Sequence, residues 1–275
     1  MTSSIHPLDQ ALALTSASPG HYTGQPHAGY WNMVGPFGGV TAATLLRAVL
    51  EHPDLLGEPL SLTVNYAGAL AAGPFTVQAT PVRTNRSTQH WTLSVLQADA
   101  VGAPVVTTTA TAVTALRRDT WSAGDVPMPP VPGPADHPAI PPALGVEWLS
   151  RYEMRPVTGA IPRQWDGTGD HSLTQLWMRD APPRPLDFCA LTALADVFFP
   201  RVWLRRAQRV PAGTVSITVY FHASSAQLQA TGMGYLLGQA RGQEFRNGFF
   251  DQSAQLWNEA GTMLATSHQI VYYKE

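Results

Sequence analysis

Segments in which apolar and polar residues alternate occur in two similar sets along the chain. SLTVNY at 61–66 and SITVYF at 216–221 both alternate, and the second begins 155 positions after the first. Alternation that includes Thr, Val and aromatic residues is typical of half-buried strands. Three further β-rich stretches follow each segment, at about 74–84, 89–98 and 104–115 and at about 227–239, 245–257 and 262–274. Short turns between such strands predict antiparallel neighbours.

One helical segment precedes each set of strands. Gly38 and Gly39 open VTAATLLRAVLEHP, whose apolar residues have near-helical spacing and which Pro53 ends. The second segment, PLDFCALTALADVFFP, runs from Pro185, which suits a first helical turn, to Pro200, where a helix stops or kinks. This segment is apolar almost all round, as is typical of a helix buried on most sides.

A buried helix wrapped by an antiparallel sheet, occurring twice, predicts an α+β double hotdog that arose by internal duplication. A single β-sandwich with two inserted helices is the alternative. Residues 122–143 hold eight prolines and almost no periodic apolar pattern, so they predict an extended linker. We therefore expect an N-terminal hotdog at 1–120, a Pro-rich linker at 121–145 and a C-terminal hotdog at 146–275 that carries the functional site.

Composition narrows the classes of function. Of the 275 residues, 44% are hydrophobic and 13% charged, against a usual charged fraction of about 25%. Such a chain folds around a core, because disorder requires low hydrophobicity and high net charge. The net charge of −2 argues against nucleic acid as the main partner. The low charge indicates that part of the surface is covered, so we expect a homo-oligomer.

The single cysteine, Cys189, excludes an internal disulfide and a Cys-rich zinc site. The nine histidines lack metal-ligand spacing, and no nucleotide-binding fingerprint is present, so we expect no metal and no cofactor. The N-terminal residues lack the pattern of a secretory signal, and the longest apolar run is too short to span a bilayer. We therefore expect a cytoplasmic protein without a membrane span.

Three polar residues are candidates for chemistry, although each alone has an ordinary structural explanation. Asp196 is the only charged residue between Asp187 and Arg201, in an apolar run. A buried carboxylate costs several kcal/mol unless it is hydrogen-bonded, so the alternative is that Asp196 lies on a narrow exposed stripe near the helix end. Thr214 directly precedes a predicted strand, and Gln269 lies in the last one. No G-x-S-x-G serine motif competes with them.

Together these residues resemble the type II acyl-CoA thioesterase family, whose members are double hotdogs. The family's A-x-D segment is matched by ALAD at 193–196, and its closing segment, which ends in Gln, is matched by GTMLATSHQ at 261–269. The helix-to-strand gap places its hydroxyl residue at Thr214, and FGG at 37–39 resembles its first helix opening. The resemblance covers about 25–115 and 145–275. It departs after Thr214, where the chain lacks the acidic and histidine residues that some members carry.

The resemblance implies that Asp196, Thr214 and Gln269 hold a water molecule that hydrolyses an acyl-CoA or related thioester. Asp196 would act as general base, and the other two would fix the water. Because no side chain here is an activated nucleophile, we expect direct attack by water. Backbone N–H groups near Gly38 and Gly39, or near Thr214, would then bind the carbonyl oxygen.

The acyl group would lie beside the second helix. Its candidate wall residues, which are equally well explained as core, are Phe188, Leu191, Phe198, Phe199 and Trp203. Two other functions remain open. The first is a non-catalytic acyl or small-ligand binding protein on the same fold. The second is a hotdog enoyl-CoA hydratase, for which no Asp-x-x-x-x-His motif is visible.

Overall fold

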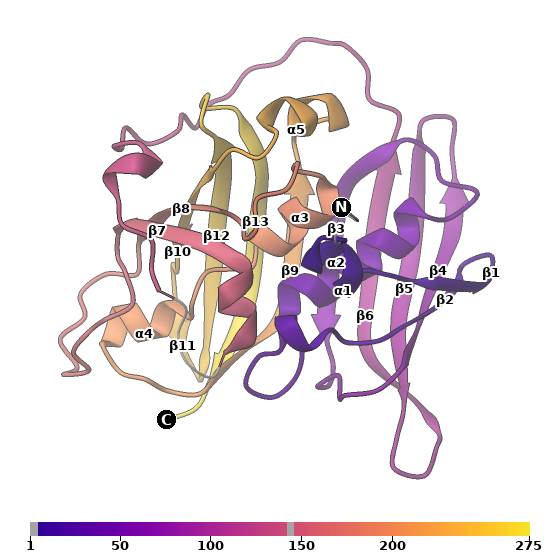
Figure 1. Ribbon diagram of the computed structural model, residues 1–275, viewed down its shortest axis with the longest axis horizontal. Helices are drawn as coiled ribbons and strands as arrows, with labels where there is room; N and C mark the ends of the chain where they lie inside the picture. The colour runs from indigo at the N-terminus through magenta and orange to yellow at the C-terminus, as the bar shows by residue number, and fades with distance from the viewer. Residues whose placement is uncertain (1–4, 142–145) are drawn as a thin grey trace.

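The structure is a computed structural model that describes residues 5–141 and 146–275 (Figure 1). The first half of the chain holds one long helix followed by four long strands, with short elements before them. The elements are α1 (Pro7–Ala11), β1 (Thr15–Ser18), β2 (His21–Gly24), the 3-10 helix η1 (Ala28–Tyr30), α2 (Gly38–Leu50), β3 (Glu58–Tyr66), β4 (Phe75–Thr84), β5 (Thr88–Ala98) and β6 (Pro104–Ala115).

The second half repeats this plan with two strands before its central helix. The elements are η2 (Pro134–Asp136), η3 (Glu147–Arg151), β7 (Tyr152–Thr158), β8 (Thr174–Asp180), α3 (Phe188–Leu194), α4 (Arg201–Arg206), β9 (Ala212–Phe221), α5 (Ser225–Thr231), β10 (Leu236–Arg241), β11 (Phe245–Arg246), β12 (Phe249–Asn258) and β13 (Met263–Tyr273).

All the strands of the described residues belong to one antiparallel sheet. Its order is β1-β2-β4-β5-β6-β3-β9-β13-β12-β10-β8-β7, and β11 pairs with β12. Strands of the first half lie on one side of the central pair β3–β9 and strands of the second half on the other, with α2 and α3 side by side in the middle (Figure 1). This is the predicted α+β double hotdog. The alternative of a β-sandwich is wrong, because the strands pair along a single path.

The two halves meet at β3 and β9, the two strands that contain the repeated alternating segments. Thr63 lies opposite Thr218, and their hydroxyl oxygens are 2.9 Å apart. The two threonines are also 155 positions apart, which is the offset between the repeated segments. Each threonine therefore pairs with its own counterpart, as expected where a pseudo-twofold axis crosses the sheet.

The central helices form the core, and every residue of α3 is buried. Gly39, in the first turn of α2, permits close contact with α3. A Cβ at this position would lie 2.7 Å from the backbone oxygen of Ala193 and 2.6 Å from the ring of Phe37. Both distances are shorter than a van der Waals contact, so a larger residue would push the helices apart.

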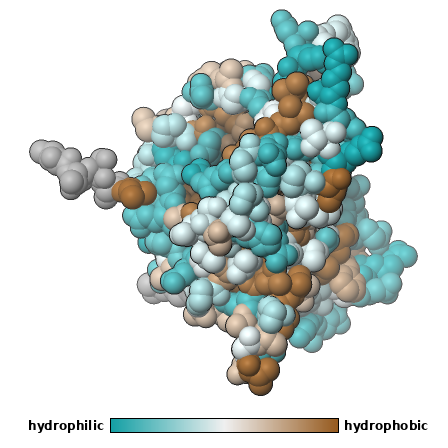
Figure 2. Space-filling model, turned by 90° about the vertical axis from the view of Figure 1, so that its right-hand side faces the viewer, coloured by the Kyte–Doolittle hydropathy of each residue, from teal (hydrophilic) through white to brown (hydrophobic). Residues whose placement is uncertain are grey.

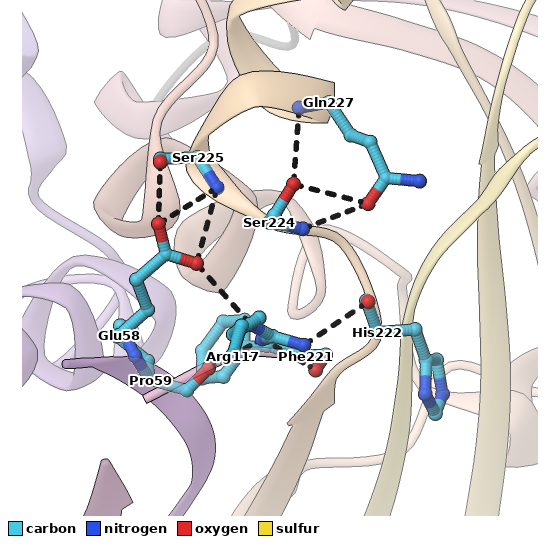
Figure 3. A network of polar contacts seen from close by, with 8 residues as sticks. All are labelled: Glu58, Pro59, Arg117, Phe221, His222, Ser224, Ser225 and Gln227. Atoms are coloured by element: carbon cyan, nitrogen blue, oxygen red, sulfur yellow. Dashed lines mark hydrogen bonds and ion pairs between the residues drawn. The ribbon is translucent and has the colours of Figure 1, made fainter. Parts of the chain in front are cut away.

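A polar network also joins the halves at one end of the central strands (Figure 3). Glu58, at the start of β3, accepts hydrogen bonds from the backbone N–H and the hydroxyl of Ser225 at the N-terminus of α5. Arg117 forms an ion pair with Glu58 at 3.2 Å and donates to the backbone oxygens of Phe221 and His222 at 3.0 and 3.2 Å. Residues from the first half therefore bind the segment that connects β9 to α5.

The helix predicted from Pro185 to Pro200 is shorter than expected. The side chain of Asp187 accepts a hydrogen bond from Ala190 N–H at 2.7 Å and caps the start of α3, which ends at Leu194. Pro200 does not end this helix but precedes α4. An Asp side chain satisfies the free N–H groups of a first turn better than Pro185 does, which explains the later start.

The predicted strand at 227–239 is wrong in its first part, which forms α5. Ser224 and Gln227 form a capping box, in which each side chain bonds the backbone N–H of the other residue. This S-x-x-Q signal marks a helix start and is readable in the sequence. The strand begins only at Leu236, after a glycine-containing turn. The pairs β1–β2 and β7–β8 were not predicted.

The Pro-rich segment lies against the second half of the sheet as far as the structure describes it; 142–145 of the predicted linker lie outside the described residues. Trp177 donates to Pro132 O at 2.9 Å, and Met128 and Val131 pack against a small cluster that contains Trp177. Among the described helices, none has the length and apolarity to cross a membrane. On the side that Figure 2 shows, apolar residues form separate patches among hydrophilic ones.

Candidate active site

Asp196 lies in the turn two residues after α3, and its side chain points into the protein. The residue is 8% exposed, so the alternative of an exposed stripe is wrong. Gln269 donates a hydrogen bond from Nε2 to Asp196 Oδ1 at 2.9 Å. Two of the three predicted polar residues are therefore in direct contact, although they are 73 positions apart.

The other carboxylate oxygen of Asp196 lies at the N-terminus of α2, which belongs to the first half of the chain. A Cβ on Gly38 would be 2.9 Å from Oδ2, and the backbone of Gly39 forms a hydrogen bond with the carboxylate. The free N–H groups and the dipole of a helix N-terminus favour negative charge. The predicted substrate contacts Gly38 and Gly39 thus lie against Asp196, and the site draws on both halves.

The environment of Asp196 opposes its ionisation. Burial raises the pKa of the Asp196 carboxyl to about 7, and the hydrogen bonds from Gln269 and Gly39 lower it only in part. A carboxyl with such a pKa is divided between its acid and its carboxylate form near neutral pH. This is the property of a group that can accept and return a proton during one reaction.

Gln269 reaches Asp196 because of the alternation in β13. Ser267, Gln269 and Val271 are buried on one face of this strand, while His268 and Ile270 are exposed on the other. Ser267 donates to the backbone oxygen of Ala195 at 3.4 Å, so adjacent residues of the inner face contact adjacent residues of the turn after α3.

Thr214 shares the inner face with Gln269 because of an irregularity in β9. Ser216 pairs with Ile270 and Thr214 with Val271, so Val215 is an extra residue at this point. A β-bulge of this kind shifts the alternation by one residue. Thr214 is only partly buried, and among the described residues its hydroxyl bonds neither Asp196 nor Gln269.

Tyr66, at the end of β3, is a neighbour of Asp196 that the sequence analysis missed. Its hydroxyl donates to Gly38 O at 2.8 Å and would lie 3.2 Å from a Cβ at Gly38. Burial and the charge of Asp196 both raise the pKa of Tyr66, so its hydroxyl stays protonated. One indication of this role was present in the sequence, the aromatic residue that ends SLTVNY, since a buried tyrosine usually bonds a partner through its hydroxyl.

The five predicted wall residues of an acyl pocket do not form one group. Phe188, Leu191 and Phe198 belong to the main core, where the Phe188 ring packs edge-on against Phe221. Trp203 packs against a separate cluster with Val202 and Phe250. The guanidinium of the buried Arg201 covers the ring of Phe199 at 4.3 Å. Three of the five are therefore core residues, as the alternative explanation has it, while Phe199 and Trp203 lie outside the main core. An acyl pocket beside these residues stays a prediction.

A small hollow of about 20 Å³ lies on the side of α2 that faces β4 and β5. Its apolar lining includes Val40 of α2, Phe75 of β4 and Val95 of β5, together with Leu70 from the β3–β4 connection. Two lining residues follow segments that lie beside Asp196. Val40 follows Gly38 and Gly39 at the start of α2, and Leu70 follows Tyr66 at the end of β3. In the part of the chain that the structure describes, no three His, Cys, Asp or Glu side chains are grouped to hold a metal ion.

The single antiparallel sheet around two central helices defines a double hotdog protein, and the buried pair Asp196 and Gln269 lies beside the N-terminus of one of these helices. Two sequence profiles match the chain. The acyl-CoA thioesterase N-terminal domain matches residues 27–114, and the acyl-CoA thioesterase C-terminal domain matches residues 125–273. The chain belongs to the type II acyl-CoA thioesterase family.

Solved structures share the fold. A hotdog-fold protein of unknown function from Alicyclobacillus acidocaldarius is 46% identical, with a TM-score of 0.92 over 99% of both chains. An acyl-CoA thioesterase II from Mycobacterium marinum is 19% identical, with a TM-score of 0.77 over 97% of this chain and 98% of that one. A dehydratase domain from Pseudomonas fluorescens is 12% identical with a TM-score of 0.53, over 98% and 99% of the chains. A comparison with the curated proteins gave no match.

Proposed function

We propose that this protein hydrolyses acyl-CoA thioesters by direct attack of a water molecule. The observation that carries the proposal is the contact of Gln269 with Asp196, a buried carboxyl whose pKa is about 7. The hydrogen bond holds the carboxyl in one orientation, and the raised pKa makes it a usable base near neutral pH. Membership of the thioesterase family supplies the class of substrate.

In the proposed reaction the carboxylate of Asp196 accepts a proton from the water while the water oxygen attacks the thioester carbon. Gln269 uses its N–H to bind Asp196, so its carbonyl oxygen is the atom available to accept a hydrogen bond from the water. The hydroxyl of Thr214, on the same face, can donate and accept as the water's second partner. The tetrahedral intermediate then breaks at the carbon–sulfur bond, and Asp196 returns the proton to the leaving thiolate.

The N-terminus of α2 stabilises charge on the reacting groups. The backbone of Gly39 already bonds the Asp196 carboxylate, and the N–H groups of Val40 and Thr41 bond Phe37 O. The N–H of Gly38 is therefore the candidate for the carbonyl oxygen. Tyr66 holds the first turn in place through Gly38 O. The first half of the chain thus contributes to the site that we predicted in the second half.

The test is release of free thiol from short, medium, long and aromatic acyl-CoAs by the wild-type protein and by Asp196→Asn. We expect hydrolysis of at least one class and a loss of about 10²–10⁴-fold in the variant, the usual worth of a general base. A folded variant with the wild-type rate would remove Asp196 from the mechanism. Tight binding of acyl-CoAs by the wild-type protein without thiol release would support the non-catalytic binding protein, and hydration of an enoyl-CoA would support the hydratase.

A further inference from the structure

A second glutamine lies directly beside Gln269 on the inner face of the sheet. In the pairing of β12 with β13, Gln252 is opposite Gln269. Directly opposite residues of antiparallel strands project to the same face with Cβ atoms about 5 Å apart. The inner face of β12 is otherwise apolar, since Phe250, Ala254 and Leu256 are its other buried residues.

Gln252 is buried without a hydrogen-bonding partner. The residue is 2% exposed, and its Nε2 has no partner among the described residues. An unsatisfied buried amide costs about 1–3 kcal/mol, and a Met or Leu of similar size would avoid this cost. Packing alone therefore does not account for a glutamine at position 252. The groups that its N–H atoms face have to be considered.

The residue directly opposite Gln252 across the strand pair is Gln269, whose amide orientation matters for the site. Gln269 turns Nε2 toward Asp196, which leaves Oε1 on the opposite branch of the planar amide group. The reverse orientation would place two oxygens in contact and remove the bond to Asp196. A donor beside Oε1 would prevent that reversal, and the terminal torsion of glutamine is soft enough for Gln252 to supply it.

We propose that Gln252 is a positioning residue, whose N–H donates to Gln269 Oε1 and thereby keeps Gln269 Nε2 on Asp196. Gln252 then donates to Gln269, and Gln269 donates to Asp196. Gln252 acts through Gln269 and touches neither the water nor the thioester. This inference rests on the proposed function, because its consequence is a change in the reactivity of Asp196.

The first test is Gln252→Met, which keeps the length of the side chain and removes its polar atoms. We expect kcat to fall about tenfold with KM within twofold, because the bond to Asp196 is weakened while substrate contacts remain. The melting temperature should change little, because one hydrogen bond is lost while a buried amide is replaced by an apolar group of the same length. The combination of lower kcat with undiminished stability separates positioning from a structural role.

The matched control is Gln255→Met on the same strand. Gln255 lies on the opposite face, where its Oε1 accepts a hydrogen bond from Gln239 at 3.3 Å. This variant should keep the wild-type kcat. Equal losses in the two variants would overturn the proposal, because they would show that any change in β12 lowers activity.

The second test is Gln252→Glu, which keeps the shape but can only accept hydrogen bonds once ionised. Gln269 would turn its N–H toward the new carboxylate, and Asp196 would lose its donor and gain a negative neighbour. Both changes raise the pKa of Asp196, so the acidic limb of the pH–rate profile should move to higher pH. An unmoved limb, or wild-type kcat in Gln252→Met, would overturn the inference while leaving the hydrolase intact. Failure of the wild-type protein to release thiol from any acyl-CoA would overturn the proposed function itself.

Discussion

Gln269 Nε2 and Asp196 Oδ1 are 2.9 Å apart in a site from which solvent is largely excluded. The contact joins the last strand of the chain to the turn after α3. It is one of the two hydrogen bonds that oppose the effect of burial on the pKa of Asp196. The pKa of the Asp196 carboxyl therefore reports on its burial and on its contact with Gln269.

The pH dependence of hydrolysis should report the ionisation of Asp196. The base must be deprotonated, and burial raises its pKa to about 7. We expect kcat/KM to fall about tenfold per pH unit below this value and to level off above it. Asp180 is a control, because burial also raises its pKa to about 7, against the opposing effect of Arg184. Asp180→Asn should keep the acidic limb, whereas the residual activity of Asp196→Asn should lack it.

Ionisation of Asp196 should lower the stability of the folded protein, although the same ionisation raises its activity. The folded state holds the Asp196 proton up to pH about 7, while the unfolded chain releases it near pH 4. Stability is therefore lost as pH rises between these values, and the loss remains above them. Asp196→Asn removes this term, so its stability relative to wild type should be higher at pH 8 than at pH 4.

The difference is expected to be on the order of 2–4 kcal/mol, from about three pKa units. Urea unfolding of both proteins at the two pH values measures it. Because constant effects of the substitution cancel between pH values, a relative stability that did not change with pH would show that Asp196 ionises normally in the fold.

Two adjacent glycines of α2 should respond differently to alanine. In Gly38→Ala the new Cβ would lie 2.9 Å from Asp196 Oδ2, so the carboxylate must move and activity should fall by about tenfold or more. In Gly39→Ala the new Cβ would meet the backbone of Ala193 at 2.7 Å, so unfolding should become easier by about 1–3 kcal/mol. Gly68→Ala is the control, since a Cβ there meets nothing within 4 Å.

Thiol release and thermal unfolding of the three variants distinguish the two effects. A loss of activity in Gly38→Ala no larger than that in Gly68→Ala would show that the carboxylate adapts without cost.

The hydroxyl of Thr214 should be required and its methyl group should not. Thr214→Val removes the proposed second partner of the water, and Thr214→Ser keeps it. We expect kcat to fall about tenfold or more in Thr214→Val and to stay within a few-fold in Thr214→Ser. Because Thr214 and Asp196 act on the same water, the losses in Thr214→Val and Asp196→Asn should not add in the double variant. Additive losses would place Thr214 outside the mechanism.

The repeat and its helices could be predicted because each leaves a periodic pattern. The offset between the two alternating segments equals the separation of Thr63 and Thr218, whose pairing was not itself predicted. Asp196 was detectable as a lone charge in an apolar run. The role of Val215 was not, since a bulge depends on the register of its neighbour strand. Tyr66 and Gln252 were missed because the groups that they face lie on other elements, Gly38 on α2 and Gln269 on β13.

The predicted homo-oligomer remains to be measured, and the outer face of the sheet offers a surface for it. Phe249 lies opposite Tyr272 on neighbouring strands, Ile270 follows on the same face, and these residues are 48%, 39% and 42% exposed. Contiguous exposed apolar side chains mark interaction surfaces. We expect light scattering to give a multiple of the 29.6 kDa chain mass and Ile270→Lys to lower it. Val101→Lys, at an exposed turn, should not. A wild-type mass of one chain would leave the low charge of the sequence without this explanation.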